Sequence, residues 1–276
     1  MTQQAAAMDR GEGPERPALA QVPPALSADN VVKRFGGIAA VDGVSLGLRQ
    51  GEIAGLIGPN GAGKTTMFDL LAGSQRPTSG HVLIDGRPVE KLASHRRIGL
   101  GVGRTFQIPR PFPDMTLVEN VMLGQQNQAG ERILPNWYLP GKVARQERET
   151  FARAMALLDF LTLSQLAREP AKVLSGGQRK LLELARVLMA DPKVILLDEP
   201  AAGVNASLLE VIIERIGEIN RRGTAILVIE HNMDMISRLC RHVFVMAGGK
   251  LLCEGTSADV SRDPRVIEAY LGGSAG

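Results

Sequence analysis

A glycine-rich turn between two apolar runs contains the residue types that point most directly to chemistry. Residues 53–57 are apolar, residues 65–71 are spaced like an amphipathic helix, and the turn between them fits G-x-x-x-x-G-K-T. This is the pattern of the phosphate-binding P-loop, whose backbone N–H groups and following helix N-terminus face an anion. The segment consists of Gly58, Pro59, Asn60, Gly61, Ala62, Gly63, Lys64, Thr65 and Thr66.

Two side chains of this segment have expected roles. Lys64 can reach the β- and γ-phosphates of a nucleotide, and the Thr65 hydroxyl can be a ligand of Mg²⁺. The alternative is a chance Gly-Lys-Thr in an ordinary turn, which the strand before it and the helix after it disfavour. The sequence therefore predicts binding of a nucleoside triphosphate.

An acidic pair follows a second apolar run, residues 194–197. In open α/β sheets, ligands bind at the carboxyl ends of the strands, where Asp198 and Glu199 would lie. We expect Asp198 to hold Mg²⁺ and Glu199 to accept a proton from the attacking water. The alternative interpretation is two solvated acids at the end of a strand.

A third motif, Leu-Ser-Gly-Gly-Gln at residues 174–178, precedes a helical pattern. Ser175 is a favourable N-cap, and the two glycines allow an anion to approach the helix amides. Alone this is a weak signal, but with the other two motifs the sequence resembles the ATP-binding cassette (ABC) ATPases over residues 29–271. The resemblance implies that the motif contacts the γ-phosphate of ATP bound by a second subunit, so that two subunits enclose two ATP molecules. The residues concerned are Ser175, Gly176, Gly177 and Gln178.

The same resemblance implies roles for three further side chains. Phe35 would stack on adenine, Gln107 would contact Mg²⁺ and water and sense a membrane partner, and His231 would contact the γ-phosphate. Without the family, the three would be interpreted as a core aromatic, a surface amide and a structural histidine. One position departs from the family pattern, because Asn205 stands where an aspartate is usual.

The distribution of apolar and turn residues predicts an α/β P-loop fold with a mixed core sheet, an antiparallel β-subdomain and a helical insert. Residues 1–27 are expected to be a disordered tail and residues 28–276 the ATP-binding domain, with the insert at about 115–173. In the insert, Phe151, Met155 and Leu158 recur at helical spacing and are expected to pack.

Composition limits the partners and the compartment. The 276 residues have a net charge of +3, with scattered basic residues, so no nucleic acid partner is expected. Two cysteines are too few for a disulfide framework and favour a reducing cytoplasm. No apolar run approaches the ~20 residues that span a bilayer, so a membrane role would need other chains.

A finer resemblance is to the ATPase subunits of branched-chain amino acid importers. It is found in residues 33–37, 104–107, 201–203, 230–233 and 264–271. It implies two transmembrane permease subunits, a periplasmic or extracellular solute-binding protein, and a peripheral position on the cytoplasmic face of the inner (plasma) membrane.

Several alternatives remain open at this point. Urea or amide import and lipopolysaccharide export use similar ATPases, and some soluble ABC ATPases act on DNA or ribosomes. The last class typically has two cassettes or a long coiled coil, whereas this sequence has one P-loop and no heptad run. A P-loop GTPase would need an N-K-x-D motif, which the sequence lacks, and the acids at the strand end argue against a non-hydrolysing scaffold.

Overall fold

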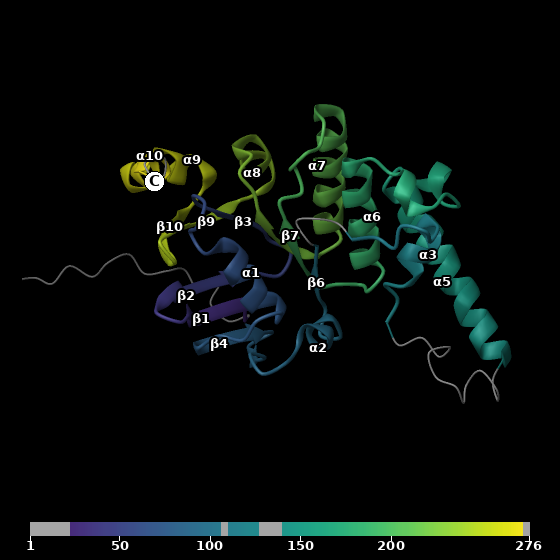
Figure 1. Ribbon diagram of the computed structural model, residues 1–276, viewed down its shortest axis with the longest axis horizontal. Coiled ribbons are helices and arrows are strands. Elements are labelled where there is room, and N and C mark those ends of the chain that lie inside the picture. Colours follow the sequence, from purple (N-terminus) through teal and green to yellow (C-terminus); the bar gives the residue numbers. More distant parts are fainter. Residues whose placement is uncertain (1–22, 106–109, 127–139, 273–276) are drawn as a thin grey trace, which may run out of the picture.

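The computed structural model describes residues 23–105, 110–126 and 140–272 (Figure 1). Gln107 and residues 1–22 of the expected tail therefore lie outside the described residues. The first strand begins at Leu26, two residues before the expected start of the ATP-binding domain at residue 28. Ala25 and Leu26 are buried in the core, and this packing holds the start of the strand in place.

An antiparallel sheet with the strand order β2-β1-β4-β5 forms one layer, as expected for the β-subdomain. Asp85 and Gly86, both with positive φ, turn the chain between β4 and β5. The strands are β1 (Leu26–Phe35), β2 (Ile38–Leu48), β4 (Ser79–Ile84) and β5 (Arg87–Pro88).

The central sheet is mixed and has the order β10-β9-β3-β8-β7-β6. Only the β9–β10 pair is antiparallel, and the other neighbours are parallel. The strands are β3 (Ile53–Ile57), β6 (Val102–Arg104), β7 (Val194–Asp198), β8 (Ala225–Ile229), β9 (His242–Ala247) and β10 (Lys250–Gly255).

Both faces of this sheet are covered, which explains why its strands are apolar without alternation. Along β7, Val194 and Leu196 pack in a cluster with α1 (Lys64–Ala72) and the antiparallel sheet. Ile195 and Leu197 pack in a second cluster on the other side, with the remaining large helices. Two cores thus hold the carboxyl ends of β3, β7 and β8 in one row.

The helical insert contains α3 (Leu117–Met122) and α5 (Pro140–Phe160), at the right of Figure 1. Thr116 and Glu119 form a capping box at the start of α3. The two ends of the insert meet, because a backbone bridge joins Thr116 to Pro170.

One packing expectation in the insert was wrong. Phe151 is 44% exposed, whereas Leu158 is fully buried and Met155 is partly buried against the same core. The buried side chains of α5 also include Ala154, so the packed face of the helix is turned away from Phe151.

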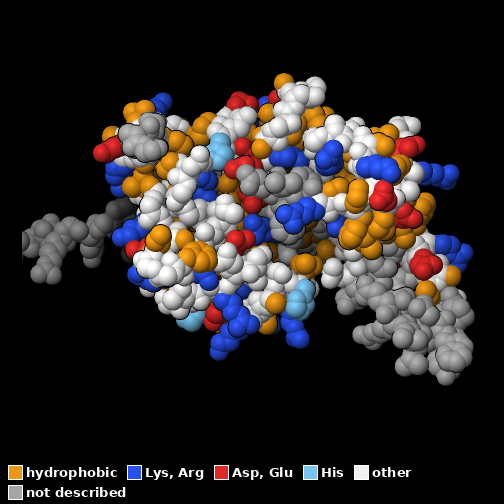
Figure 2. Space-filling view, in the orientation of Figure 1, with side chains coloured by type: hydrophobic (Ala, Val, Ile, Leu, Met, Phe, Trp, Pro, Cys, Tyr) orange, Lys and Arg blue, Asp and Glu red, His pale blue; other side chains and the backbone are white. Residues whose placement is uncertain are grey.

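The remaining helices surround the sheet (Figure 1). They are α2 (Ser94–Ile98), α6 (Gly176–Leu188), α7 (Ala206–Arg221), α8 (Met233–Leu239), α9 (Ser257–Arg262) and α10 (Pro264–Gly272). In the part of the chain that the structure describes, no helix is long and apolar enough to cross a membrane. Figure 2 shows basic, acidic and apolar side chains interspersed over one face.

Candidate nucleotide site

The P-loop is pressed between β2 and β9 at positions that only glycine can occupy. Gly58 has φ +149°, and a Cβ there would lie 2.1 Å from the Met246 carbonyl oxygen. Gly63 has φ +96°, and a Cβ would lie 2.3 Å from the Ala40 carbonyl oxygen. A side chain at either position would force the loop open, so these glycines fix its tight curl.

The N-terminus of α1 is available to an anion. Its N-cap, Gly63, makes no side-chain cap and the first turn contains no acidic residue. Lys64 Nζ arches back over the loop and donates to the carbonyl oxygens of Gly58 at 2.6 Å and Pro59 at 3.0 Å. Burial lowers the pKa of Lys64, and the nearby carboxylates of Glu199 and Asp198 oppose that shift. A cation and a helix N-terminus therefore face the same space.

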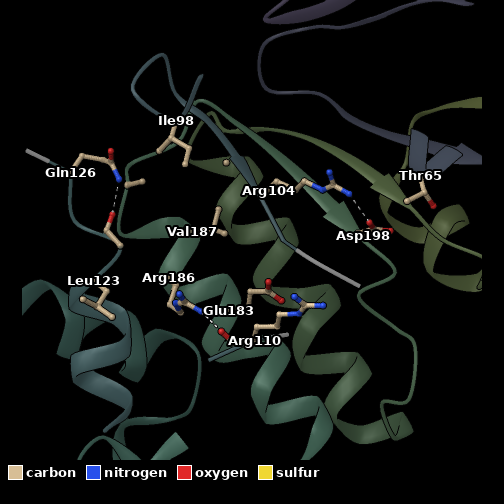
Figure 3. A pocket seen from close by; sticks show the side chains of 13 residues that line it. Thr65, Ile98, Arg104, Arg110, Leu123, Gln126, Glu183, Arg186, Val187 and Asp198 are labelled. Atoms are coloured by element: carbon tan, nitrogen blue, oxygen red, sulfur yellow. Dashed lines mark hydrogen bonds and ion pairs between the residues drawn. The ribbon is translucent and has the colours of Figure 1, made fainter. Parts of the chain in front are cut away.

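Asp198 ends β7 with 5% of its surface exposed. Burial raises the pKa of Asp198, while Arg104, whose Nη2 lies 3.2 Å from Oδ2, acts in the opposite direction. Figure 3 shows Arg104 reaching from β6 to this carboxylate, with Thr65 beyond it. Asp198 and Thr65 both line a cleft of about 680 Å³.

The donor chemistry of this cleft fits Mg²⁺. A hydroxyl and a carboxylate are hard oxygen ligands, and Mg²⁺ is usually bound by one or two carboxylates together with substrate phosphates. Among the described residues there is no cluster of three or more His, Cys, Asp and Glu side chains that could hold a metal unaided. The arrangement suits an ion that arrives with a nucleotide.

Glu199 and His231 follow adjacent parallel strands, β7 and β8, and meet at their common edge. Glu199 Oε1 lies 3.0 Å from His231 Nε2. Glu199 has φ +48°, uncommon for a residue with a side chain, and its N–H donates to the Ile229 carbonyl oxygen at 2.9 Å. The structure thus brings together two side chains that are 32 positions apart in the sequence.

The Ser-Gly-Gly-Gln motif begins α6. Ser175 and Gln178 form a reciprocal capping box, in which the Gln178 N–H donates to Ser175 Oγ and the Ser175 N–H to Gln178 Oε1. A Cβ at Gly176 would meet no described heavy atom within 4 Å, whereas one at Gly177 would lie 2.3 Å from Leu208 Cδ2. The first glycine therefore faces open space, and the second lets α7 pack closely.

The structure bears on the expected environment of Phe35 and on the departure from the family pattern at Asn205. Phe35, at the end of β1, is 48% exposed with Lys33 Nζ 5.0 Å from its ring centroid, so the core-aromatic alternative is wrong. Stacking on adenine stays a prediction, as does the role of Gln107. Asn205, the departure from the family pattern, is the N-cap of α7 and accepts from the Leu208 N–H at 2.9 Å.

Three charged residues at the site were not anticipated. Arg104 pairs with Asp198, Lys180 of α6 donates to the Glu199 carbonyl oxygen, and Glu230 accepts from three backbone N–H groups. Arg104 and Glu230 lie in stretches that resemble the importer subgroup, but the sequence of those stretches does not indicate which groups they contact.

A P-loop among the parallel strands of a mixed sheet, with an acidic strand end and a histidine facing it, defines a P-loop nucleotide-binding protein. Residues 41–202 match the family described as ABC transporter. The chain belongs to the ABC transporter family and is an ATP-binding, ATP-hydrolysing subunit. Residues 250–276 also match a segment described as branched-chain amino acid ATP-binding cassette transporter.

Two relatives are similar over nearly the full chain. One, from Archaeoglobus fulgidus, is called probable branched-chain amino acid transport ATP-binding protein LivG; it is 39% identical over 90% of this chain and 95% of its own. The other is the high-affinity branched-chain amino acid transport ATP-binding protein BraF of Pseudomonas aeruginosa. It is 36% identical over 90% of this chain and 98% of its own.

Solved structures agree with this assignment of fold. A nucleotide-free ATP-binding cassette from an ABC transporter superposes with a TM-score of 0.78 at 36% identity, over 88% of this chain and 97% of that one. The cassette MJ0796, a dimer in a post-hydrolysis state bound to ADP and Pi, superposes with a TM-score of 0.70 at 25% identity. That match covers 84% of this chain and 98% of that one.

Proposed function

We propose that this ATPase subunit powers the uptake of branched-chain or closely related amino acids through partner permeases. The observation that carries the proposal is the match of residues 250–276 to the branched-chain segment, which lies outside the P-loop core common to ABC ATPases. The names of the similar relatives point to the same class of solute.

ATP binding is assigned to the P-loop and Phe35. The amides at the start of α1 and the Lys64 ammonium would hold the β- and γ-phosphates, because both present positive charge to one space. Thr65 and Asp198 would hold Mg²⁺, which neutralises charge on the phosphates when bound. Phe35, half-exposed at the end of β1, offers a ring face to adenine.

Hydrolysis is assigned to Glu199 and His231. Glu199 would take the proton of the attacking water, and His231, 3.0 Å from its carboxylate, would orient Glu199 and contact the γ-phosphate. Gln107 would help to position the water. These groups act mainly by positioning and charge stabilisation, as is usual in phosphoryl transfer.

The working unit is proposed to contain two ATPase subunits, identical or not. Ser175 to Gln178 of one subunit would close on ATP in the P-loop of the other, with Gly176 providing open access to the helix amides. Two transmembrane permease subunits would hold the pair at the cytoplasmic face of the membrane, and a solute-binding protein would deliver the amino acid.

The decisive experiment is reconstitution of the chain with its permeases and solute-binding protein in vesicles. Leucine, isoleucine or valine should stimulate ATP turnover and accumulate inside, whereas urea should do neither. Stimulation by urea alone, or ATP-driven lipopolysaccharide release, would instead identify one of the related systems. Full activity on DNA or ribosomes without permeases would exclude the proposed transport function.

A variant links that transport to the assigned base. Glu199→Gln should bind ATP with unchanged affinity but lose turnover and uptake by about a hundredfold or more, because an amide cannot accept the proton. The matched control is Glu210→Gln, which removes an exposed carboxylate paired with Arg238. Normal steady-state turnover by the Glu199 variant would remove Glu199 from this role.

A further inference from the structure

A buried carboxylate lies beside the assigned base and histidine without touching the nucleotide cleft. Glu230 directly follows β8, directly precedes His231, and is only 3% exposed. Burying a carboxylate is costly unless hydrogen bonds and a counter-charge compensate it. The contacts of Glu230 show what this position provides.

Each oxygen of Glu230 holds a different turn. Oε1 accepts from the Ala201 N–H at 2.6 Å, in the turn that follows Glu199. Oε2 accepts from the N–H groups of His231 at 2.9 Å and Asn232 at 3.1 Å. Because a carboxylate is rigid and planar, this single group fixes the backbone of one turn relative to the other.

The counter-charge comes from the helix that begins with the Ser-Gly-Gly-Gln motif. Burial lowers the pKa of Lys180, and Glu230 is the strongest of the carboxylates that oppose this shift. Lys180 also donates to the Glu199 carbonyl oxygen. The backbone around Glu199, which has the uncommon positive φ, is thus held by Ile229, Lys180 and Glu230.

We propose that Glu230 is a positioning residue for ATP hydrolysis, which sets the separation of Glu199 and His231 by holding both of their turns on one carboxylate. The inference rests on the roles proposed above for Glu199 and His231. It extends those roles by naming the group that keeps Glu199 and His231 correctly placed relative to each other during ATP hydrolysis. A shift of about 1 Å between catalytic groups can cost about a hundredfold in rate.

The substitution Glu230→Gln tests this with almost no change of volume. A glutamine has one accepting oxygen, so it can serve the Ala201 N–H or the His231 and Asn232 pair, and its NH₂ group must face the other. One turn is then released. In the full-length chain we expect kcat for ATP hydrolysis to fall about ten- to a hundredfold, with the KM for ATP within about twofold.

The control for a purely structural effect is Arg97→Lys. Arg97 is fully buried and donates to four carbonyl oxygens in and around α1 and α2, none of them in the assigned base–histidine pair. Its variant should lower the melting temperature while kcat per folded molecule stays normal. Glu230→Gln should lower kcat at temperatures where both variants are folded.

A double variant tests whether Glu230 acts through the histidine. In a His231→Ala background, Glu230→Gln should cause less than about a twofold further loss, since the pair it aligns is already broken. The inference would be overturned if the losses from His231→Ala and Glu230→Gln multiplied independently. It would also be overturned if the single Glu230→Gln variant had a kcat within twofold of wild type. If the glutamine variant does not fold, Glu230→Asp carries the test, because the shorter side chain cannot span both turns, and full turnover by it would overturn the inference.

Failure of the inference is separable from failure of the assigned roles. If Glu199→Gln and His231→Ala each reduce turnover strongly while Glu230→Gln is normal, only the positioning role is wrong. If those two variants themselves keep normal turnover, the proposed roles are wrong and the positioning role falls with them.

Discussion

Single side chains do their work here through charges paired across distant segments. Lys64 reaches over the P-loop near Asp198 and Glu199, and Arg104 neutralises part of the charge of Asp198. These cations and anions are largely buried and compensate one another, because an unpaired buried charge would be costly. Removing any one of them should therefore affect ligand binding more than an exposed ion pair would.

Lys64→Ala gives a direct test of the phosphate site. A charge-assisted hydrogen bond contributes about 1.5–3 kcal/mol, so nucleotide affinity should fall about ten- to a hundredfold. The measurement is titration with a fluorescent ATP analogue. The matched control is Lys193→Ala, which removes an exposed lysine paired with Asp85 and should bind normally. Equal affinity in both variants would contradict the assignment.

Helices and strands set which groups can meet. Parallel pairing of β7 with β8 delivers Glu199 and His231 to one edge, because the carboxyl ends of parallel strands coincide. At the start of α6 the two glycines have separate duties, since Gly177 packs against Leu208 of α7 and Gly176 faces open space.

This division predicts opposite results for two alanine variants. Gly177→Ala should lower the melting temperature by several degrees, because its Cβ would overlap Leu208 and push α6 from α7. Gly176→Ala should melt normally but lose most ATP turnover, because its methyl group would block approach to a partner's phosphate. Calorimetry and steady-state hydrolysis distinguish the two. Normal turnover by Gly176→Ala would argue against the role proposed for this motif.

At the level of the complete chain, the P-loop and the Ser-Gly-Gly-Gln motif begin different helices, α1 and α6. The cleft that contains Thr65 and Asp198 is lined by described residues of α1, α2, the sheet, the insert and α6, but by none of residues 174–178. This separation fits an assembly in which the motif serves a second subunit.

Cysteine crosslinking measures that assembly. In the Glu199→Gln background, Asn60→Cys combined with Ser175→Cys should give a crosslinked dimer with ATP and little without it. Asn60 and Ser175 are both exposed. The control pair, Asn60→Cys with Ser237→Cys on α8, should stay monomeric under the same conditions. Equal crosslinking with and without ATP would exclude a nucleotide-gated contact between these two positions.

Much of the fold could be predicted because its signals are local. The apolar runs at residues 53–57 and 194–197, which form β3 and β7, and the N-cap at Ser175 are confirmed by the structure. The short elements α2, β6, α8 and α9 were not predicted, since pieces of three to seven residues have little periodicity of their own. Phe151 was wrongly predicted to pack, because helical spacing alone does not determine which face of a helix its neighbours cover.

The amino-acid sequence was sufficient to predict nucleotide binding, the P-loop and the acidic strand end. Each of these is encoded by adjacent residues with fixed backbone requirements. Only the three-dimensional fold decided the partners: Arg104 with Asp198 across 94 positions, Glu199 with His231 across 32, and Glu230 with Ala201 across 29. Such contacts depend on which strands lie side by side and on what is buried between them. No short stretch of sequence carries that information.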